Sequence, residues 1–296
     1  MATSPAAHEQ PVLRFAPSPN GRLHLGHALS ALVNERFAAR LRGRLLLRIE
    51  DIDPGRCRPE FETAIHEDLA WLGLRFDGAA RRQSEHLPDY EAALARLAGM
   101  NLLYPCFCSR QAVKAVVAER EAGGGGWPRD PDGAPLYPGC CRSLNPDEAR
   151  RRVAAGEPHA LRLRMDEAVR LAGALRYRHF DEEGLETDVP ADPSRWGDVV
   201  LARRDVPTSY HLAVVVDDAL QGVTHVVRGR DLEAATDIHV LLQRLLGLPT
   251  PLYHFHRLLL DADGQKLAKS RGSRSLADLR AEGLGPVELR QRLGFA

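Results

Sequence analysis

The chain has 296 residues, of which 44% are hydrophobic and 27% charged, a composition typical of a globular protein with one large domain and an insertion, or with two domains. Forty basic and forty acidic side chains give a formal net charge of zero, so any nucleic-acid contact must use a local basic patch. No apolar run is long enough to span a membrane, the first ten residues lack the apolar core of a signal peptide, and five cysteines suit a reducing compartment better than a disulfide framework. We therefore expect a cytoplasmic protein without membrane contact.

The first elements predicted are a strand over 12–16 and a helix over 25–41, separated by turn residues. Apolar side chains recur through the second stretch at helical spacings of three, four and seven. His24, Gly26 and His27 come at the start of this helix, where free backbone N–H groups and the helix dipole favour a phosphate. Two imidazoles three residues apart can share a face, and a glycine lets a flat ring approach the backbone. Taken alone, the four residues are equally well explained as a helix start with two surface histidines.

A buried strand is predicted over 44–49, where three leucines in succession fit a strand covered on both faces. The alternation continues with a helix over 60–72, a short strand over 74–76 and a helix over 90–97. Strands alternating with helices predict a doubly wound α/β core, in which ligands bind at the carboxyl edge of the sheet. Glu50 ends the buried strand, so it is either a ligand-binding carboxylate or a strand-end group that caps or pairs with Arg48.

Cysteines cluster in the next part of the chain. Cys106 and Cys108 precede a helix-like stretch, and Cys140 and Cys141 follow a loop rich in glycine and proline. Two cysteine-bearing turns separated by a loop fit a structural Zn²⁺ site, which takes four ligands and favours thiolates. A partly degraded site without metal is the alternative.

The segment 102–190 is predicted to form an inserted domain. It contains a helix over 147–155 with three consecutive arginines, and the stretches 160–165 and 176–180 alternate like strands of one small antiparallel sheet. The arginines suit contact with an RNA end, and a solvated helix face explains them at least as well.

A second alternating half begins near residue 191. We predict strands over 199–202, 212–216 and 223–227 and a helix over 234–246, which Gly247 ends. Further on, Lys266 and Lys269 are two of only three lysines in the chain. Paired ammonium groups in so arginine-rich a sequence suggest point charges for a phosphate chain. Ser275 is predicted to cap a short helix, and a last helix is predicted over 287–293.

The stretches 24–27 and 266–270 together resemble the HIGH and KMSKS signatures of the class I aminoacyl-tRNA synthetases. The resemblance narrows to the glutamyl branch through RFAPSP at 14–19, RIEDID at 48–53 and VRGRD at 227–231, and it extends from about residue 12 to the C-terminus. Asn20 stands where that branch usually has Thr or Ser, and Ala268 where it usually has Ser. Neither difference removes a charged group.

The resemblance implies a class I synthetase fold. This fold has a doubly wound, Rossmann-like parallel sheet, into which an α+β domain that contains zinc is inserted. A short helical segment follows at the C-terminus. The implied division is 11–101 for the first half of the core, 102–190 for an acceptor-binding insertion, 191–260 for the second half, and 261–296 for the KMSKS-like loop and the last helices. We expect no anticodon-binding domain.

The resemblance also implies roles for single residues. Glutamate would be bound by Arg14, Ala16, Ser18, Glu50, Tyr210 and Arg228, with Arg228 on its side-chain carboxylate and with Glu50 and Tyr210 at its amino end. ATP would be bound by His24, Gly26, His27 and Lys269, and catalysis would depend on His24, His27, Lys266 and Lys269. Gly229 and Asp231 would lie near the ribose. Ordinary surface salt bridges are the alternative for Arg230 and Asp231, and the roles of these two are left open. The implied zinc ligands are Cys106, Cys108, Tyr137 and Cys141, with Cys140 as the substitute for the uncommon phenolate.

These roles imply an ATP-dependent ligase that activates L-glutamate to glutamyl-adenylate without tRNA, with Mg²⁺ accompanying ATP and one structural Zn²⁺. The truncated branch of the family then transfers glutamate to queuosine in the anticodon of tRNA(Asp), and we expect a monomer with that partner. A synthetase-like fragment charging a tRNA 3′ end is the alternative. Small-molecule nucleotidyltransferases share the His-x-Gly-His helix start without predicting Glu50 or the cysteines. An RNA-binding relic would not be expected to keep both histidines and both lysines.

Overall fold

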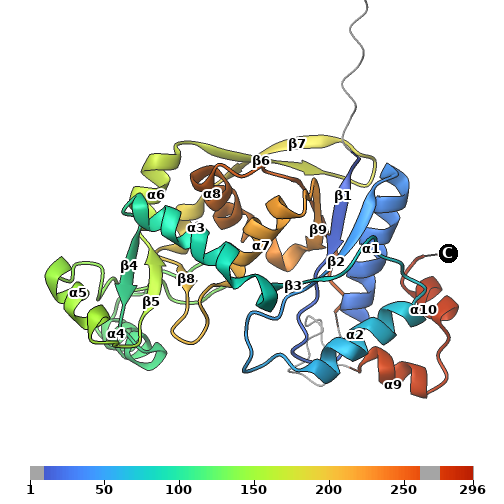
Figure 1. Cartoon of the computed structure of the whole chain (residues 1–296), viewed down its shortest axis with the longest axis horizontal. Coiled ribbons are helices and arrows are strands. Elements are labelled where there is room, and N and C mark those ends of the chain that lie inside the picture. The colour runs from blue at the N-terminus through green and yellow to red at the C-terminus, as the bar shows by residue number, and fades with distance from the viewer. Residues whose placement is uncertain (1–9, 261–273, 296) are drawn as a thin grey trace, which may run out of the picture.

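The computed structural model describes residues 10–260 and 274–295, and two adjoining, largely parallel sheets form its centre (Figure 1). The first has the order β1 (Val12–Phe15), β2 (Arg44–Ile49) and β3 (Arg81–Arg82), all parallel. The second has the order β7 (Glu186–Ala191), β6 (Leu175–Phe180), β10 (Leu252–His256) and β9 (His225–Gly229), with only β7 antiparallel. The Thr224 N–H donates to the Val12 carbonyl at 2.9 Å just before β9, which joins the two sheets. The predicted parallel α/β core is confirmed.

Side chains alternate between the two faces of the first sheet, and helices cover both faces. Leu13 and Leu45 face a core built with α1 (Leu25–Leu41) and α2 (Pro59–Trp71). Val12 and Leu46 face the other core, which includes α3 (Leu87–Gly99), α7 (Tyr210–Leu220) and α8 (Thr236–Leu246). Arg14 and Arg48 follow the same alternation as Val12 and Leu46. Two guanidinium groups are therefore directed into the layer that contains α7.

The cysteine-bearing part of the chain forms a separate small sheet at one end of the molecule (left in Figure 1). Its three antiparallel strands are β4 (Leu103–Cys106), β5 (Ala160–Leu163) and β8 (Val200–Ala202). The helices of this region are α4 (Arg110–Ala122) and α5 (Pro146–Ala154), whereas α6 (Met165–Ala172) follows β5 and packs in the core that contains α8. Single 3₁₀ turns lie at Gln83–His86, Pro193–Trp196 and Arg230–Leu232.

Three predicted elements are wrong. Residues 212–216 lie inside α7 rather than in a strand, because a short apolar run fits a buried helix as well as a buried strand. Residues 74–76 form no strand, and β3 comes later, at Arg81–Arg82. The stretches 160–165 and 176–180 do not share a sheet: β5 pairs with β4 and β8, whereas β6 pairs in parallel with β10. The last part of the proposed insertion therefore contributes strands to the central sheet.

The last described helices, α9 (Leu276–Ala281) and α10 (Pro286–Arg292), pack beside α1 and α2. Ser275 caps α9 as predicted: its hydroxyl accepts from the Asp278 N–H, and Asp278 accepts from the Ser275 N–H. The Leu276 N–H donates to the Leu23 carbonyl at 2.8 Å. This contact places α9 directly beside the start of α1. In the part of the chain that the structure describes, no helix is both long and apolar enough to cross a membrane.

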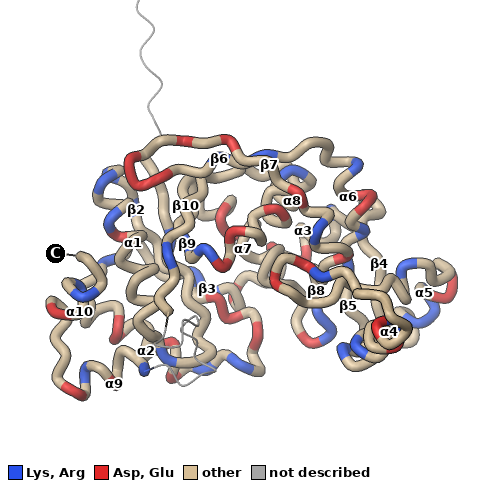
Figure 2. The backbone as a smooth tube through the Cα atoms, turned by 180° about the vertical axis from the view of Figure 1, so that it is seen from behind, with Lys and Arg blue, Asp and Glu red and all other residues tan. Residues whose placement is uncertain are grey.

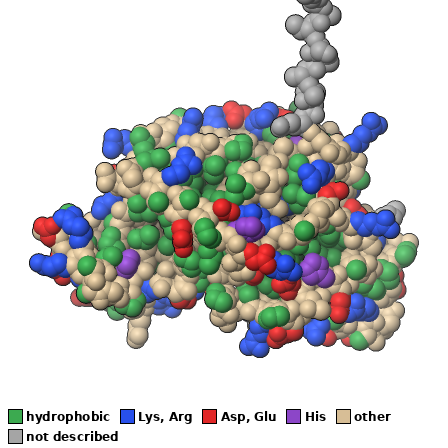
Figure 3. Space-filling view, viewed as in Figure 1, with side chains coloured by type: hydrophobic (Ala, Val, Ile, Leu, Met, Phe, Trp, Pro, Cys, Tyr) green, Lys and Arg blue, Asp and Glu red, His purple; other side chains and the backbone are tan. Residues whose placement is uncertain are grey.

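Charges of both signs are interspersed along the chain and over the visible surface (Figures 2 and 3). The arginine run of α5 illustrates this, since Arg150, Arg151 and Arg152 form ion pairs with Asp147, Glu148 and Glu157 respectively. These pairs are at the surface and contribute little to stability. The run therefore presents a mixed rather than a purely basic face.

Candidate active site

A cavity of about 1150 Å³ opens at the carboxyl ends of β1, β2 and β9. Its walls come from the loop after β1, the start of α1, the end of β2, the start of α7 and the end of β9. Every glutamate-site residue predicted from the sequence lines it: Arg14, Ala16, Ser18, Glu50, Tyr210 and Arg228. His24, Gly26 and His27 line it as well. Lys266 and Lys269 lie outside the described residues.

The start of α1 fixes the two histidines through their own backbone. The Gly26 N–H donates to His24 Nδ1 at 3.1 Å, and the His24 N–H donates to His27 Nδ1 at 3.1 Å. Since both Nδ1 atoms accept, each neutral imidazole carries its proton on Nε2. A Cβ at Gly26 would lie 2.9 Å from His24 Cε1, so the glycine is needed because the His24 ring covers it. The arrangement places two imidazole Nε2–H donors at a helix N-terminus, a combination suited to phosphate oxygens.

Glu50 is held at the end of β2 beside a fully buried arginine. Its Oε1 lies 3.5 Å from Arg48 Nη2. Burial raises the pKa of Glu50 to about 6, and the positive charges of Arg48 and Arg14 oppose that rise. The Glu50 carboxylate therefore pairs with Arg48 and also lines the cavity, and its binding of a ligand stays a prediction.

Arg228 reaches the cavity from β9 and is 5% exposed. Its Nη2 donates to Thr236 Oγ1 at 2.7 Å, and its Nη1 lies 3.0 Å from His239 Nδ1. Among the described residues, no carboxylate forms an ion pair with this guanidinium. Because a buried charge normally needs a counter-ion, such a group beside a cavity is suited to bind an anion from outside.

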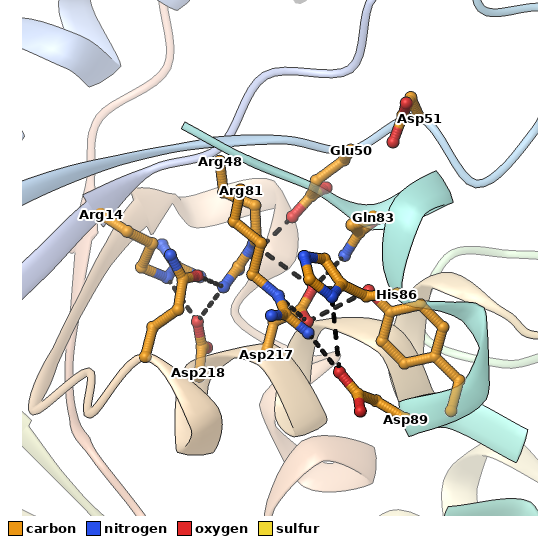
Figure 4. A network of polar contacts seen from close by, with 12 residues as sticks. Arg14, Arg48, Glu50, Asp51, Arg81, Gln83, His86, Asp89, Asp217 and Asp218 are labelled. Carbon is orange, nitrogen blue, oxygen red and sulfur yellow. Dashed lines mark hydrogen bonds and ion pairs between the residues drawn. The ribbon is translucent and has the colours of Figure 1, made fainter. Parts of the chain in front are cut away.

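Beneath the cavity lies a buried polar network that the sequence patterns did not indicate (Figure 4). Asp218 accepts from Arg14 Nε at 3.0 Å and from Arg48 Nη1 at 2.7 Å. Burial would raise the pKa of Asp218, but the two arginines hold it below its ordinary value. The neighbouring Asp217 accepts from Arg81 Nε at 2.7 Å, and also from Gln83 and Tyr90. The only sequence feature that could have indicated this network is the pair Asp217 and Asp218 directly after the apolar run 212–216.

The residues of the 227–231 motif at the end of β9 differ in whether they line the cavity. Gly229 and Asp231 line the cavity, as expected for residues near a ligand. Arg230 does not line it and instead lies 3.6 Å from Glu233 in a largely exposed ion pair. This surface pair matches the ordinary alternative considered for Arg230.

The four predicted metal ligands converge in the small domain. Cys106 and Cys108 Sγ lie 3.3 and 3.4 Å from the Tyr137 hydroxyl, and Cys108 Sγ lies 3.5 Å from Cys141 Sγ. The three sulfur atoms are all within 4.8 Å of one another. Cys140, the predicted substitute, is exposed and does not belong to this group.

The donor chemistry of this cluster fits a zinc ion. Three thiols and a phenol at mutual distances near 3.5 Å can surround one tetrahedral ion. Burial raises the pKa of Cys108 to about 12, so this sulfur is protonated unless a cation replaces the proton. The geometry thus favours Tyr137 over Cys140 as the fourth ligand.

Comparison with known proteins gives a consistent result. Residues 11–294 match the family described as tRNA synthetases class I (E and Q), catalytic domain. The chain is 48% identical over 289 residues to a glutamyl-Q tRNA(Asp) synthetase of Rhodobacter capsulatus, covering 96% of this chain and 100% of that protein. It is 39% identical to glutamate–tRNA ligase 2 of Nitrosococcus oceani, covering 93% of this chain and 57% of that protein.

A solved structure has the same fold. It is a glutamate tRNA ligase of Elizabethkingia meningosepticum in complex with its amino acid, with a TM-score of 0.72 and 28% identity. The match covers 93% of this chain, which spans 54% of the length of that ligase.

Proposed function

Because the chain belongs to the class I tRNA synthetases of the glutamate and glutamine type, and is a ligase of that class, we propose that it activates L-glutamate with ATP and transfers the glutamate to queuosine in tRNA(Asp). The observation that carries the amino-acid assignment is the buried Arg228 guanidinium, which lines the cavity without a carboxylate partner among the described residues. The acceptor assignment is supported by the full-length similarity to a protein named glutamyl-Q tRNA(Asp) synthetase.

In this proposal the cavity holds glutamate by its two ends. Arg228 binds the side-chain carboxylate, and Glu50 binds the ammonium group with help from Tyr210. Arg14 adds positive charge from β1, and Ala16 and Ser18 contribute the wall after that strand. The α-carboxylate is then left free to act as the nucleophile.

Adenylation needs no covalent bond to the protein. The α-carboxylate attacks the α-phosphorus of ATP in line, and the bond to pyrophosphate breaks. His24 and His27 donate their Nε2 protons in hydrogen bonds to phosphate oxygens, and the positive end of the α1 helix dipole lies at the same place. We assign Lys266 and Lys269 to the departing pyrophosphate from the sequence motif alone. Mg²⁺ bound with ATP would neutralise phosphate charge.

We propose that the cysteine cluster is structural. Cys106, Cys108, Tyr137 and Cys141 would hold one Zn²⁺, which supplies a closed four-ligand cross-link. The cluster joins the end of β4 to the loop before α5, so the ion would stiffen the domain that we assign to acceptor binding. None of the four ligands lines the active-site cavity.

Two measurements test the proposal. Glutamate-dependent ATP–pyrophosphate exchange should proceed in the absence of tRNA. Labelled glutamate should then be transferred to tRNA(Asp) from cells that make queuosine, with its 3′ end intact or blocked, and not to the same tRNA from cells that lack queuosine.

An ordinary synthetase activity is the second candidate, because the chain is 39% identical to a glutamate–tRNA ligase. Transfer that ignores queuosine and disappears when the 3′ end is blocked would overturn the queuosine assignment in favour of this candidate. Absence of any glutamate-dependent exchange would overturn both.

A further inference from the structure

Behind Arg228, away from the cavity, two histidines form a chain of hydrogen bonds. Arg228 Nη1 lies 3.0 Å from His239 Nδ1, and His239 Nε2 lies 3.3 Å from His211 Nδ1. His239 comes from α8 and is 2% exposed, and His211 comes from the first turn of α7. Neither histidine lines the cavity. Both rings are packed against the Tyr210 ring, with centroids 5.7 and 5.5 Å away.

The proton positions in this chain follow from the donor. A guanidinium can only donate, so His239 Nδ1 must accept and its proton must lie on Nε2. That Nε2–H then donates to His211 Nδ1, whose own proton lies on Nε2. Both imidazoles are therefore neutral. Burial and the Arg228 charge favour the same state, since burial lowers the pKa of His211 to about 4 and that of His239 well below its ordinary value.

This arrangement orients Arg228 without cancelling its charge. Thr236 and His239 supply neutral acceptors, and the guanidinium carbon also lies 5.4 and 5.8 Å from the ring centroids of Tyr253 and Phe255. Arg14 is different, because Asp218 forms a direct ion pair with it. A carboxylate in place of His239 would form a comparable pair with Arg228 and would compete with any anion that enters the cavity.

We propose that His239 is a positioning residue that sets the preference of the site for glutamate over glutamine, with His211 orienting its ring by accepting the Nε2 proton. The inference rests on the proposed activation of glutamate. A neutral acceptor leaves the full positive charge of Arg228 for the substrate's side-chain carboxylate. Glutamine has the same shape but no charge, so it gains much less from that guanidinium.

The test compares three variants in ATP–pyrophosphate exchange with glutamate and with glutamine. In His239→Glu, the new carboxylate should neutralise Arg228, raise the KM for glutamate about a hundredfold and leave the KM for glutamine within about threefold. In His239→Gln, a neutral acceptor remains, and the ratio of kcat/KM for the two substrates should stay within about tenfold of the parent. His211→Phe should fall between them, because His239 loses the acceptor of its Nε2 proton and is held less firmly against Arg228.

A separate measurement covers the case in which the Glu variant does not fold. In the parent protein, ¹⁵N NMR should show a pyridine-like Nδ1 and a protonated Nε2 for His239. A proton on Nδ1 would overturn the proposal.

Equal loss of activity with both substrates in His239→Glu and His239→Gln would reduce His239 to a structural role. Unchanged discrimination in a folded His239→Glu would overturn the proposal and leave the proposed function intact. A parent protein without glutamate-dependent exchange would overturn both.

Discussion

Replacing Asp218 by Asn should destabilise the protein strongly, because this one carboxylate neutralises two buried arginines. Asp218 Oδ1 accepts from Arg48 Nη1 at 2.7 Å and from Arg14 Nε at 3.0 Å, and the side chains of the arginines are 0% and 6% exposed. Asn has the same shape and keeps an acceptor oxygen, so the change removes the charge with little change in packing. It leaves two guanidinium groups with less compensation in a layer shielded from water.

The size of the expected loss of stability depends on which carboxylates each arginine still contacts in the variant. Arg48 still has Glu50 at 3.5 Å and Asp217 at 3.9 Å. Arg14 loses the only carboxylate with which it pairs among the described residues. Breaking a buried pair from one side costs about 3–5 kcal/mol, and the partners left to Arg48 reduce the expected loss to about 3 kcal/mol. A loss of that size is a large fraction of the total stability of a typical domain.

Urea unfolding at pH 7 measures this loss, with Glu186→Gln as the matched control. Glu186 forms an ion pair of similar length, 2.7 Å, with Arg178, but the two side chains are 39% and 62% exposed. The control should cost at most about 1 kcal/mol. Adding Arg14→Met to Asp218→Asn should cost less than the sum of the two single changes, since the residues are in direct contact. A loss for Asp218→Asn no larger than that of the control would refute the reasoning.

Three further predictions concern the proposed sites. Cys108→Ser should lower the zinc content to far below one ion per chain, as metal analysis would show. It should also lower the free energy of unfolding by at least about 2 kcal/mol in a denaturation experiment, whereas Cys140→Ser should change neither quantity. Lys269→Ala should lower the kcat of pyrophosphate exchange about a hundredfold with little effect on the KM for glutamate, and Lys114→Ala on α4 should leave both unchanged; near-normal turnover would contradict the assignment. The KM for glutamate should rise as the pH falls through about 6, because protonated Glu50 no longer attracts the substrate ammonium group, and Glu50→Gln should remove that part of the pH dependence.

The sequence predicted the elements that have a local signature. The periodic apolar residues of 25–41 gave α1 with its observed bounds, and the leucine run gave β2. The motif residues of the cavity are all near element ends, where turn and cap signals mark the position. For the same reason the start of α9 at Ser275 could be predicted.

The sequence could not predict what depends on pairing between distant residues. The strand predicted over 212–216 is wrong, because five consecutive apolar residues have no period that separates a buried strand from a buried helix. Once that run belongs to α7, Asp217 and Asp218 lie in the same helix and meet Arg14 and Arg48 across more than 160 positions of sequence. The sequence pattern around His239 indicates only an amphipathic helix. Its contact with Arg228 depends on how α8 packs against β9.

Two of the arginines that line the cavity, Arg14 and Arg228, have charges that are balanced in different ways, and this difference bears on which end of glutamate reacts. Arg14 shares its charge with Asp218, whereas Arg228 is held by neutral partners. In the proposed complex the side-chain carboxylate of glutamate binds the guanidinium of Arg228, and Glu50 binds the ammonium group. A strong cation fixed on the α-carboxylate would lower the nucleophilicity of its oxygens. Because Arg14 is already paired, it can attract and orient that carboxylate without binding it as tightly as Arg228 binds the other end. The proposed site would thereby anchor the carboxylate that must not react and leave the other one free to attack phosphorus.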